Sequence, residues 1–479
     1  MVAFRRAIWN FALDRALEWA ERLGKPLVVL EALRCDYPWA SDRMHSFVLD
    51  GMAENACRFE GTGVLHYPFM EFEPNAGKGL LPAMAAHASV VVTDDFPCFF
   101  LPRMVAAAAA QVAVRMEAVD SNGPLPLRTS DQAFSTAYAF RRFLQKKLPL
   151  HLTEFPKINA LVNVTVPAAS GIPREITARW PRMSARLLNG DRSFLAKMPI
   201  NHSVPRVLAR GGTNVAQAIL KEFVENKLES YLEERNEPDR NAASGLSPYL
   251  HFGHISAHQI FSEITQREGW SPEHLALRAT GSRTGWWGIG RAAEAFLNQL
   301  VTWRELGFNF CCQRKDYDQF DSLPEGARRT LREHARDERA YVYTLEEFEQ
   351  AATHDPLWNA AQTELVGKGS IHNYLRMLWG KKILEWTSSP VKALEIMVEL
   401  NNKYALDGRD PNSYSGIFWC LGRYDRPWGP ERPVFGTVRY MSSTNTAKKL
   451  GVEEYLRNYT PNQQRRKMGV NRSTQRVTN

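Results

Sequence analysis

The first 125 residues alternate between two hydrophobic patterns. Short, nearly continuous apolar runs are typical of strands that are buried on both faces of a parallel sheet. These runs are residues 26–33, 62–69, 89–95 and 112–120. Segments with the helical spacing of apolar residues, such as 9–23 and 41–59, lie between them. The alternation predicts an α/β domain at residues 1–125 with a doubly wound parallel sheet.

Domains of this kind usually begin with a strand at the centre of the sheet, whereas this chain begins with the helical segment 9–23. We therefore expect that the first strand is either absent or encoded upstream of residue 1. Prolines are dense between residues 126 and 213, which predicts a long interdomain connection. Helical spacing dominates residues 214–459 and predicts an all-α domain, and the basic segment 460–479 is expected to be a disordered tail.

Composition narrows the class of protein. The chain has 479 residues, 44% of them hydrophobic, and a formal net charge of +8, which suits nucleic acid as a partner, although many basic proteins bind none. Its six cysteines form no C-x-x-C pair, so we expect reduced thiols and no metal site. The most apolar run, residues 104–114, is too short to span a membrane. We expect an intracellular, cytoplasmic monomer without a membrane partner.

Two features of the helical half suggest chemistry. Residues 244–247, Ser-Gly-Leu-Ser, offer hydroxyls and unhindered N–H groups before a helix, which can hold a phosphate, although an ordinary helix cap is the more common use of such residues. Trp379 and Trp386 are seven residues apart and share one face of a predicted helix, with Trp358 on the helix before it. Core packing is the usual role of such a stripe, and electron transfer between indoles is the alternative.

Five stretches carry a resemblance to a known family. They are "SGLSPYLHFGHIS", "DPLWNAAQTEL", "RMLWGKKILEW", "LDGRDPNSYSGI" and "ERPVFGTVRYM". In order and spacing they resemble the photolyase/cryptochrome family and, within it, the class II cyclobutane pyrimidine dimer photolyases. The resemblance implies an α/β domain followed by a helical domain that binds FAD. It also implies light-driven electron transfer from reduced FAD to a pyrimidine dimer in DNA, which splits the dimer.

The resemblance assigns site residues one by one. The positions that match FAD contacts in the family are Tyr231, Ser244, Gly245, Leu246, Ser247, Asn373, Arg376, Asn401, Asp407, Gly408, Arg409, Asp425 and Arg426. The positions that match contacts to DNA or to the lesion are Arg235, Gln299, Trp303, Met377, Trp419 and Trp428. The family's photoreduction chain corresponds to Trp379, Trp358 and Trp386, from proximal to distal, and Asn401 corresponds to an asparagine beside flavin N5.

One departure from the family pattern bears on activity. Class II members usually have two adjacent glutamates where this chain has Asn298 and Gln299, and the second glutamate contacts the dimer. The amide of Gln299 keeps the shape and a donor N–H but has no proton to give. We therefore expect slower repair, with an activation barrier that is higher by about 1–2 kcal/mol. The alternative is a cryptochrome-like photoreceptor or another non-repair flavoprotein of the same fold. An antenna chromophore of the deazaflavin type is left open, because the first strand helps to build its pocket.

Overall fold

The computed structural model describes residues 1–190 and 192–460, which form two compact units. Unit 1 comprises Met1–Leu232, Ala242–Ser322 and Leu406–Ser415. Unit 2 comprises Glu233–Asn241, Leu323–Ala405 and the chain from Gly416 onwards. These units follow spatial contacts, and the expected boundaries at residues 125, 213 and 459 stay a prediction. The expected tail at 460–479 lies outside the described residues, except for Thr460.

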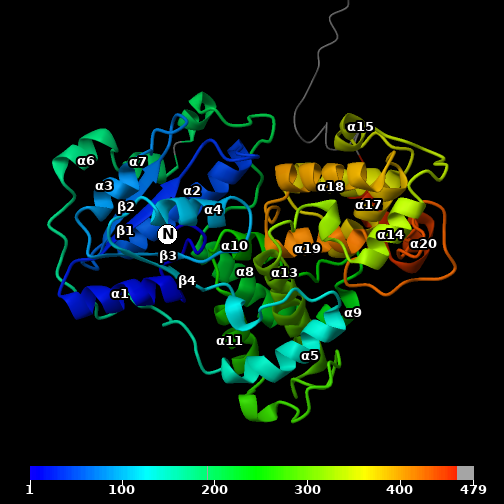
Figure 1. Ribbon diagram of the computed structural model, residues 1–479, viewed down its shortest axis with the longest axis horizontal. Coiled ribbons are helices and arrows are strands. Elements are labelled where there is room, and N and C mark those ends of the chain that lie inside the picture. Colours follow the sequence, from blue (N-terminus) through cyan, green and yellow to red (C-terminus); the bar gives the residue numbers. More distant parts are fainter. Residues whose placement is uncertain (191, 461–479) are drawn as a thin grey trace, which may run out of the picture. The chain divides into compact units, whose positions relative to one another are not determined.

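Unit 1 begins with alternating helices and parallel strands, as the hydrophobic pattern predicts (Figure 1). Strand β1 (Val28–Leu33) pairs in parallel with β2 (Leu65–Met70), and β3 (Val90–Asp94) pairs in parallel with β4 (Arg115–Val119). The helices between and around them are α1 (Phe11–Leu23), α2 (Asp42–Phe59), α3 (Leu80–Ala85) and α4 (Leu101–Ala109). The predicted parallel α/β region is therefore confirmed.

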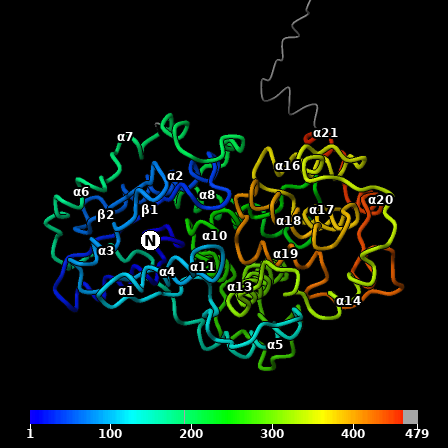
Figure 2. The backbone as a smooth tube through the Cα atoms, turned by 45° about the horizontal axis from the view of Figure 1, so that its top comes forward, coloured from blue at the N-terminus to red at the C-terminus, as the bar shows by residue number. Residues whose placement is uncertain are grey.

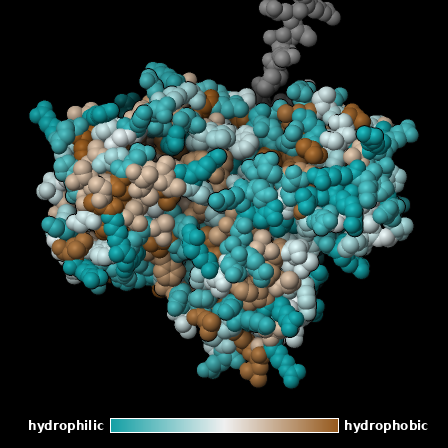
Figure 3. Space-filling model, in the orientation of Figure 1, coloured by the Kyte–Doolittle hydropathy of each residue, from teal (hydrophilic) through white to brown (hydrophobic). Residues whose placement is uncertain are grey.

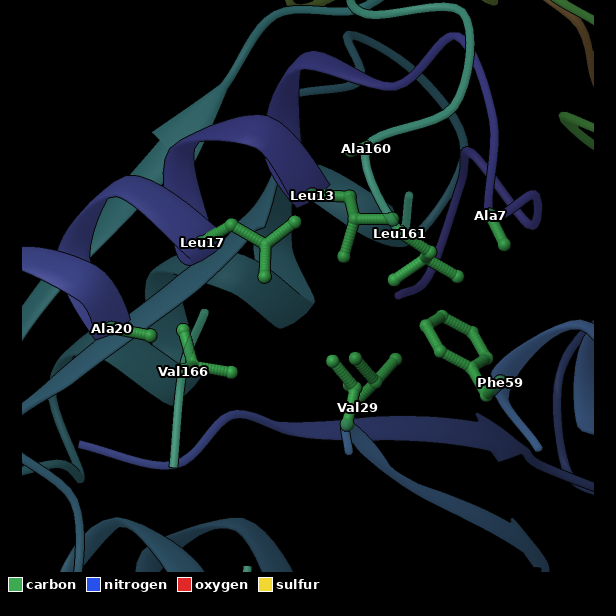
Figure 4. Packing of buried hydrophobic residues seen from close by; sticks show 10 residues of the cluster. Ala7, Leu13, Leu17, Ala20, Val29, Phe59, Ala160, Leu161 and Val166 are labelled. Atoms are coloured by element: carbon green, nitrogen blue, oxygen red, sulfur yellow. The ribbon is translucent and has the colours of Figure 1, made fainter. Parts of the chain in front are cut away.

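Helix α1 shows how this region forms a core. The Asn10 side chain caps its first turn by accepting from the N–H groups of Ala12 and Leu13. Leu13 and Leu17 lie one turn apart on the buried face. They belong to a hydrophobic cluster that joins α1 to β1, to the end of α2 and to the segment around residue 160 (Figure 4). Its labelled members are Ala7, Leu13, Leu17, Ala20, Val29, Phe59, Ala160, Leu161 and Val166.

The sheet itself differs from the simplest prediction. Among the described residues, the strands form two separate parallel pairs, β1–β2 and β3–β4, without a central strand that would join them. Residues of β1, β3 and α4 line one cavity of about 460 Å³. Helix α4 is apolar in sequence, yet none of its residues is buried. Figure 3 shows hydrophobic residues gathered in this area of unit 1, which fits an incompletely covered layer.

The rest of unit 1 is mainly helical. The proline-rich segment 126–213, predicted to be an interdomain connection, contains the regular helix α5 (Ala137–Lys147), which its density of prolines does not indicate. Thr136 caps α5, and Phe140 and Leu144 lie one turn apart on its buried face, which explains the helix. The other helices that begin in unit 1 before residue 322 are α6 (Arg174–Arg179), α7 (Ala185–Leu188), α8 (Thr213–Asn226), α9 (Tyr231–Glu234), α10 (Ser247–His251), α11 (Ala257–Arg267), α12 (Arg291–Leu297) and α13 (Arg304–Gln313). Short 3₁₀ turns lie at Leu127–Thr129, Leu148–Leu150, Ser193–Lys197, Pro272–His274 and Phe320–Ser322.

Unit 2 is built around three neighbouring helices, α16 (Pro356–Lys368), α17 (Asn373–Glu385) and α18 (Pro390–Tyr404), which pack on one another (Figure 2). Two of them start at a capping side chain followed by proline, α16 at Asp355-Pro356 and α18 at Ser389-Pro390. The remaining helices are α14 (Glu325–Glu333), α15 (Leu345–Glu349), α19 (Pro411–Cys420, which begins in unit 1), α20 (Ser443–Lys449) and α21 (Glu453–Tyr459). No helix in residues 1–190 or 192–460 is both long and apolar enough to cross a membrane.

Candidate active site

Gln299 and Trp303 lie in a stretch of π-helix, Asn298–Trp303, between α12 and α13. The N–H of Arg304 reaches back five residues to the carbonyl oxygen of Gln299, instead of the four residues of an α-helix. Both side chains are half-buried. Short π-helical stretches are rare and often occur at functional sites. The sequence pattern predicts one continuous α-helix here, so the π-helix is a correction.

The helix before this stretch contacts a predicted cofactor residue. The ring of Phe296 in α12 lies 5.3 Å from the ring of Tyr231, at an interplanar angle of 81°. Tyr231 is buried and begins α9, after α8 has ended at Asn226. Unit 1 therefore places Tyr231 against the helix that continues into Gln299.

The turn Ser244–Ser247 presents backbone groups at the surface of unit 1. Gly245 has a φ of +70°, and a Cβ built on it would meet no atom closer than the Ile219 Cγ2, at 3.9 Å. The N-cap of α10 is Leu246, which makes no side-chain cap, so the ordinary serine cap is not what forms here. The Ser244 hydroxyl instead accepts the Leu246 N–H at 3.4 Å. The turn thus offers hydroxyls and accessible N–H groups of the kind that bind phosphate.

The segment Asp407-Gly408-Arg409 is buried in unit 1. The Arg409 guanidinium lies 3.3 Å from the Met44 sulfur, and the Arg409 carbonyl accepts the thiol of Cys98. Burial lowers the pKa of Arg409 from its usual value. Arg409 also has a φ of +64°, a strained conformation for a residue with a side chain. Its side chain therefore supports the α/β region, and its predicted contact with FAD stays a prediction.

The three tryptophans that correspond to the family's photoreduction chain lie in contact in unit 2. The rings of Trp379 and Trp358 are parallel within 4°, with centroids 6.5 Å apart. Trp358 and Trp386 follow at 6.2 Å and 69°. Trp358 is fully buried, Trp379 is 2% exposed and Trp386 is 3% exposed. Trp386 is the C-cap residue of α17, one residue after the helix ends. The helix face that Trp379 and Trp386 were predicted to share therefore stops just before Trp386. The order Trp379, Trp358, Trp386 thus corresponds to a continuous series of ring contacts.

The series continues beyond Trp386 through residues that the sequence reasoning missed. The Trp386 ring lies 4.9 Å from His354 and 5.9 Å from Tyr343. The Tyr343 hydroxyl is 2.7 Å from His354 Nδ1. Tyr341 stacks on His354 at 3.7 Å and is 46% exposed. Aromatic contacts therefore connect the buried indoles to the surface of unit 2. The sequence signal was only the Tyr-x-Tyr pair at 341–343.

The N-terminus of α17 carries further predicted residues. Asn373 is exposed and Arg376, one turn later, is half-buried. The His372 N–H donates to Glu364, which also accepts the hydroxyl of Tyr455. Arg235 lies close by, since its backbone is hydrogen-bonded to the His372 ring, whose pKa burial lowers to about 4. The structure thus brings Arg235, Asn373 and Arg376 to one end of α17.

Asn401 lies near the end of α18 and is 2% exposed. Its Nδ2 donates to the Asn402 Oδ1 at 3.2 Å. An amide side chain combines an acceptor oxygen with donor N–H groups. That combination is what the predicted position beside a flavin requires.

Helices α17 and α19 meet at the predicted lesion residues Met377 and Trp419. Gly380 permits the approach, because a Cβ there would lie 2.6 Å from the Cys420 sulfur. The Met377 methyl is 3.8 Å from a Cβ built at Gly416 in α19. Met377 and Trp419 are both half-buried. Unit 2 therefore places these two predicted residues at one helix junction.

Cations lie over the indoles at this end of unit 2. Lys381 Nζ is 4.9 Å from the ring centroid of Trp419, and the Arg439 guanidinium is 5.8 Å from it. Arg439 also lies 5.0 Å from the Trp428 ring, and Arg426 lies 4.9 Å from it. Trp428 is 36% exposed. A stacked cation and indole at the surface, such as Arg426 and Trp428, suit contact with the phosphates and bases of nucleic acid, whereas Lys381 is fully buried.

Asp425 and Arg426, both predicted to contact FAD, meet through a backbone hydrogen bond. The Asp425 carboxylate accepts the backbone N–H of Arg426, and the Arg426 guanidinium lies over Trp428. One Asp425 oxygen, Oδ2, is buried without a hydrogen-bond partner among the described residues. Such an atom is costly unless a ligand or water meets it.

A buried acid, Glu305, lies two residues beyond Trp303. Burial raises its pKa to about 8, and the nearby Arg304 opposes this shift. Its Oε1 is 3.7 Å from Arg304 Nη1, and Gly123 leaves it room, since a Cβ there would overlap it. No group of metal-binding side chains with three or more members occurs among the described residues.

The chain is similar to proteins of known activity over almost its whole length. It is 36% identical to a deoxyribodipyrimidine photo-lyase of Methanothermobacter thermautotrophicus over 457 residues, which cover 95% of this chain and 92% of that protein. It is 34% identical to the deoxyribodipyrimidine photo-lyase of Oryza sativa over 473 residues, which cover 95% of this chain and 86% of that protein. Cryptochrome-1 of Sinapis alba is 27% identical over 271 residues, 49% of this chain and 48% of that protein. No model of a known protein family matches the chain.

Solved structures share the fold. A bacterial class III photolyase from Agrobacterium tumefaciens superposes with a TM-score of 0.67 at 15% identity, covering 95% of this chain and 84% of that one. An archaeal photolyase from Sulfolobus tokodaii, solved with two FAD molecules, gives a TM-score of 0.65 at 16% identity, covering 95% and 87%. At this identity the likeness concerns the fold.

Proposed function

This chain belongs to the photolyase/cryptochrome family, among the deoxyribodipyrimidine photo-lyases, and on that premise we propose that it uses light to split cyclobutane pyrimidine dimers in DNA. The observation that carries the proposal is the continuous contact of Trp379, Trp358 and Trp386, because a series of buried indoles serves electron transfer. The net charge of +8 suits a DNA partner.

The residues present fit FAD. The turn Ser244–Ser247 has hydroxyls, a left-handed glycine and an uncapped helix start, which together suit a diphosphate. Tyr231 in unit 1, and Asn373, Arg376 and Asn401 in unit 2, are proposed as further contacts, and the unpartnered Asp425 Oδ2 is an acceptor that a bound group could use. When bound, reduced and excited by light, FAD supplies the electron that opens the cyclobutane ring.

The chain's own residues would hold the substrate and guide electrons. Trp303, Met377 and Trp419 are proposed to contact the dimer, where each indole can stack on a base for about 1–3 kcal/mol. Arg235 and Trp428 are proposed to contact flanking DNA. Gln299 would donate an N–H to a dimer carbonyl without transferring a proton. Asn401 would hydrogen-bond the cofactor, and the three tryptophans would restore its reduced state.

An antenna chromophore of the deazaflavin type remains a proposal of its own. Unit 1 has an apolar cavity of about 460 Å³. Tyr37, Phe99 and Phe100 line it, and the Tyr37 and Phe100 rings are stacked at 5.9 Å. A flat aromatic ring system suits such a wall. Reconstitution with a deazaflavin and energy transfer to FAD would support it, and absence of binding would exclude it.

The substrate class is tested with matched damaged oligonucleotides. The purified protein, loaded with FAD and chemically reduced, is illuminated with blue light on DNA that holds either a cyclobutane thymine dimer or a 6–4 photoproduct. We expect loss of the cyclobutane dimer and no change in the 6–4 product. Repair of the 6–4 product alone would replace the proposed substrate, and binding of the dimer without repair of either lesion would favour a photoreceptor.

A further inference from the structure

Two adjacent lysines of α17 each lie over a tryptophan, but only one has a counter-ion. Lys382 Nζ is 5.3 Å from the Trp386 ring and 2.5 Å from the Glu385 carboxylate. Lys381 Nζ is 4.9 Å from the Trp419 ring, and among the described residues it has no hydrogen-bond partner. Lys381 is fully buried. Trp419 therefore faces a positive charge without a directly bonded counter-ion among the described residues, whereas the charge beside Trp386 is paired with Glu385.

Trp379 and Trp358 of the photoreduction chain have hydrogen-bond acceptors beside their indole N–H groups. The Trp379 indole N–H donates to the Gln362 Oε1 at 2.9 Å, and the Trp358 indole N–H donates to the Trp379 carbonyl at 3.0 Å. A carbonyl oxygen at the N–H stabilises positive charge on an indole. A cation over the ring face stabilises the neutral indole but repels the oxidised one, and low polarity strengthens that repulsion. Trp379 and Trp358 are thus easier to oxidise than Trp419.

We propose that Lys381 protects Trp419 from oxidation and so keeps the electron vacancy of photoreduction on Trp379, Trp358 and Trp386. The inference rests on the proposed function. In photoreduction one electron leaves the protein for the bound cofactor. The vacancy passes from Trp379 to Trp358 and then to Trp386, each step oxidising one indole and reducing the one before it. An added thiolate reductant then gives Trp386 one electron, and the resulting thiyl radicals end as disulfide.

The charges around Lys381 allow a pH test. Burial lowers the pKa of Lys381 to about 8; Cys420 of α19 and Asp425 oppose the shift, and Arg439 adds to it. The Cys420 thiol stays neutral below its own pKa, which burial raises to about 11. The Arg439 guanidinium lies 5.8 Å from the same ring. Lys381 is therefore the group facing Trp419 that changes charge between about pH 6.5 and about pH 9.5.

The test measures which tryptophan is finally oxidised, Trp419 or Trp386. The FAD-loaded protein is illuminated without thiol and in the presence of dioxygen, which adds to the oxidised indoles, and peptide mass spectrometry measures oxygenated Trp419 relative to oxygenated Trp386. We expect this ratio to rise at least about fivefold in Lys381→Gln and to stay at the wild-type value in Lys381→Arg. Lys382→Gln is the matched control, because the charge it removes was already balanced by Glu385. The Trp419 yield itself should therefore not rise in Lys382→Gln.

The wild-type protein provides a second arm that needs no variant. Its ratio should rise from about pH 6.5 to about pH 9.5, and Lys381→Arg should show no such rise. A ratio that stays within twofold in Lys381→Gln and with pH, while photoreduction proceeds, would overturn this inference alone. Photoreduction that persists unchanged in Trp379→Phe would instead overturn the proposed electron path.

Discussion

The indole rings of Trp358 and Trp379 lie parallel, 6.5 Å apart, and are joined by a hydrogen bond from the Trp358 N–H to the Trp379 carbonyl. Two helices hold this arrangement, because the Asp355 cap fixes the start of α16 and Gln362 fixes the Trp379 ring. The rigid spacing makes this pair the first link of the proposed electron path.

Replacing Trp379 with Phe removes that link while keeping an aromatic ring in the core. We expect photoreduction of the oxidised cofactor to slow by at least about tenfold, which is about 1.4 kcal/mol in the barrier. Repair by protein that is reduced chemically beforehand should stay within about twofold of wild type. Flash absorption measures the first rate and dimer loss the second. Trp287→Phe, at an equally buried indole of unit 1, is the control and should change neither.

Tyr343 is expected to connect the distal tryptophan to the surface. Its hydroxyl is 2.7 Å from His354 Nδ1, so oxidation of the phenol can pass its proton to the imidazole. In Tyr343→Phe the oxidised state of Trp386 should last about three- to tenfold longer, as transient absorption can measure. Tyr341→Phe keeps the stacking on His354 and serves for comparison. An unchanged lifetime in Tyr343→Phe would show that Trp386 is the end of the path.

Restoring a carboxyl group at the π-helix should speed repair. Gln299→Glu adds a group that can give a proton to the dimer, and we expect repair about 5- to 30-fold faster, or about 1–2 kcal/mol. The gain should disappear as pH rises through the pKa of the new carboxyl. Asn298→Glu is the neighbouring control and should show no comparable gain. Equal or slower repair by Gln299→Glu at every pH would refute the role assigned to this position.

Stability should depend on pH through Glu305. Burial raises its pKa to about 8 in the folded protein, so the neutral acid favours folding. This contribution is complete below the pKa of the unfolded chain, about 4.3, and is lost as pH rises through about 8. Glutamine cannot ionise, so in Glu305→Gln the unfolding free energy should decrease less than in the wild type over that pH range. The difference between the two decreases should be about 1–3 kcal/mol. Urea titrations at several pH values measure this, and parallel curves for both proteins would contradict the assignment.

Much of the fold followed from hydrophobic patterning, since the runs that predict strands and helices match β1 to β4 and α1, α2, α16 and α17 closely. The divided sheet could be suspected because the hydrophobic pattern places a helical segment, residues 9–23, before the first strand pattern. The helix α5 was missed because prolines on both sides concealed its apolar spacing. Local spacing predicts elements well, whereas pairing between strands depends on segments far apart in the chain.

The residues of the candidate site stay a prediction from the family pattern, and much of the geometry around them has no local signal in the sequence. The π-helix at Gln299 was missed, because over six residues its spacing hardly differs from that of an α-helix. Lys381 and Lys382 look equivalent in sequence, and only packing gives one of them a counter-ion. The orientation of the Arg409 side chain depends on its contact with Met44, which lies hundreds of residues earlier in the chain. Such long-range contacts leave no local signal.

Light-dependent dimer splitting by the reduced protein tests the central claim most directly. The FAD-loaded protein is reduced chemically, mixed in excess with an oligonucleotide that carries one cyclobutane thymine dimer, and followed by the return of thymine absorbance. We expect restoration of thymine under blue light, none in the dark, and a lower yield with Trp419→Ala at protein concentrations just sufficient to saturate the wild type. Lesion-bound, fully reduced protein that restores no thymine under prolonged illumination would contradict the account.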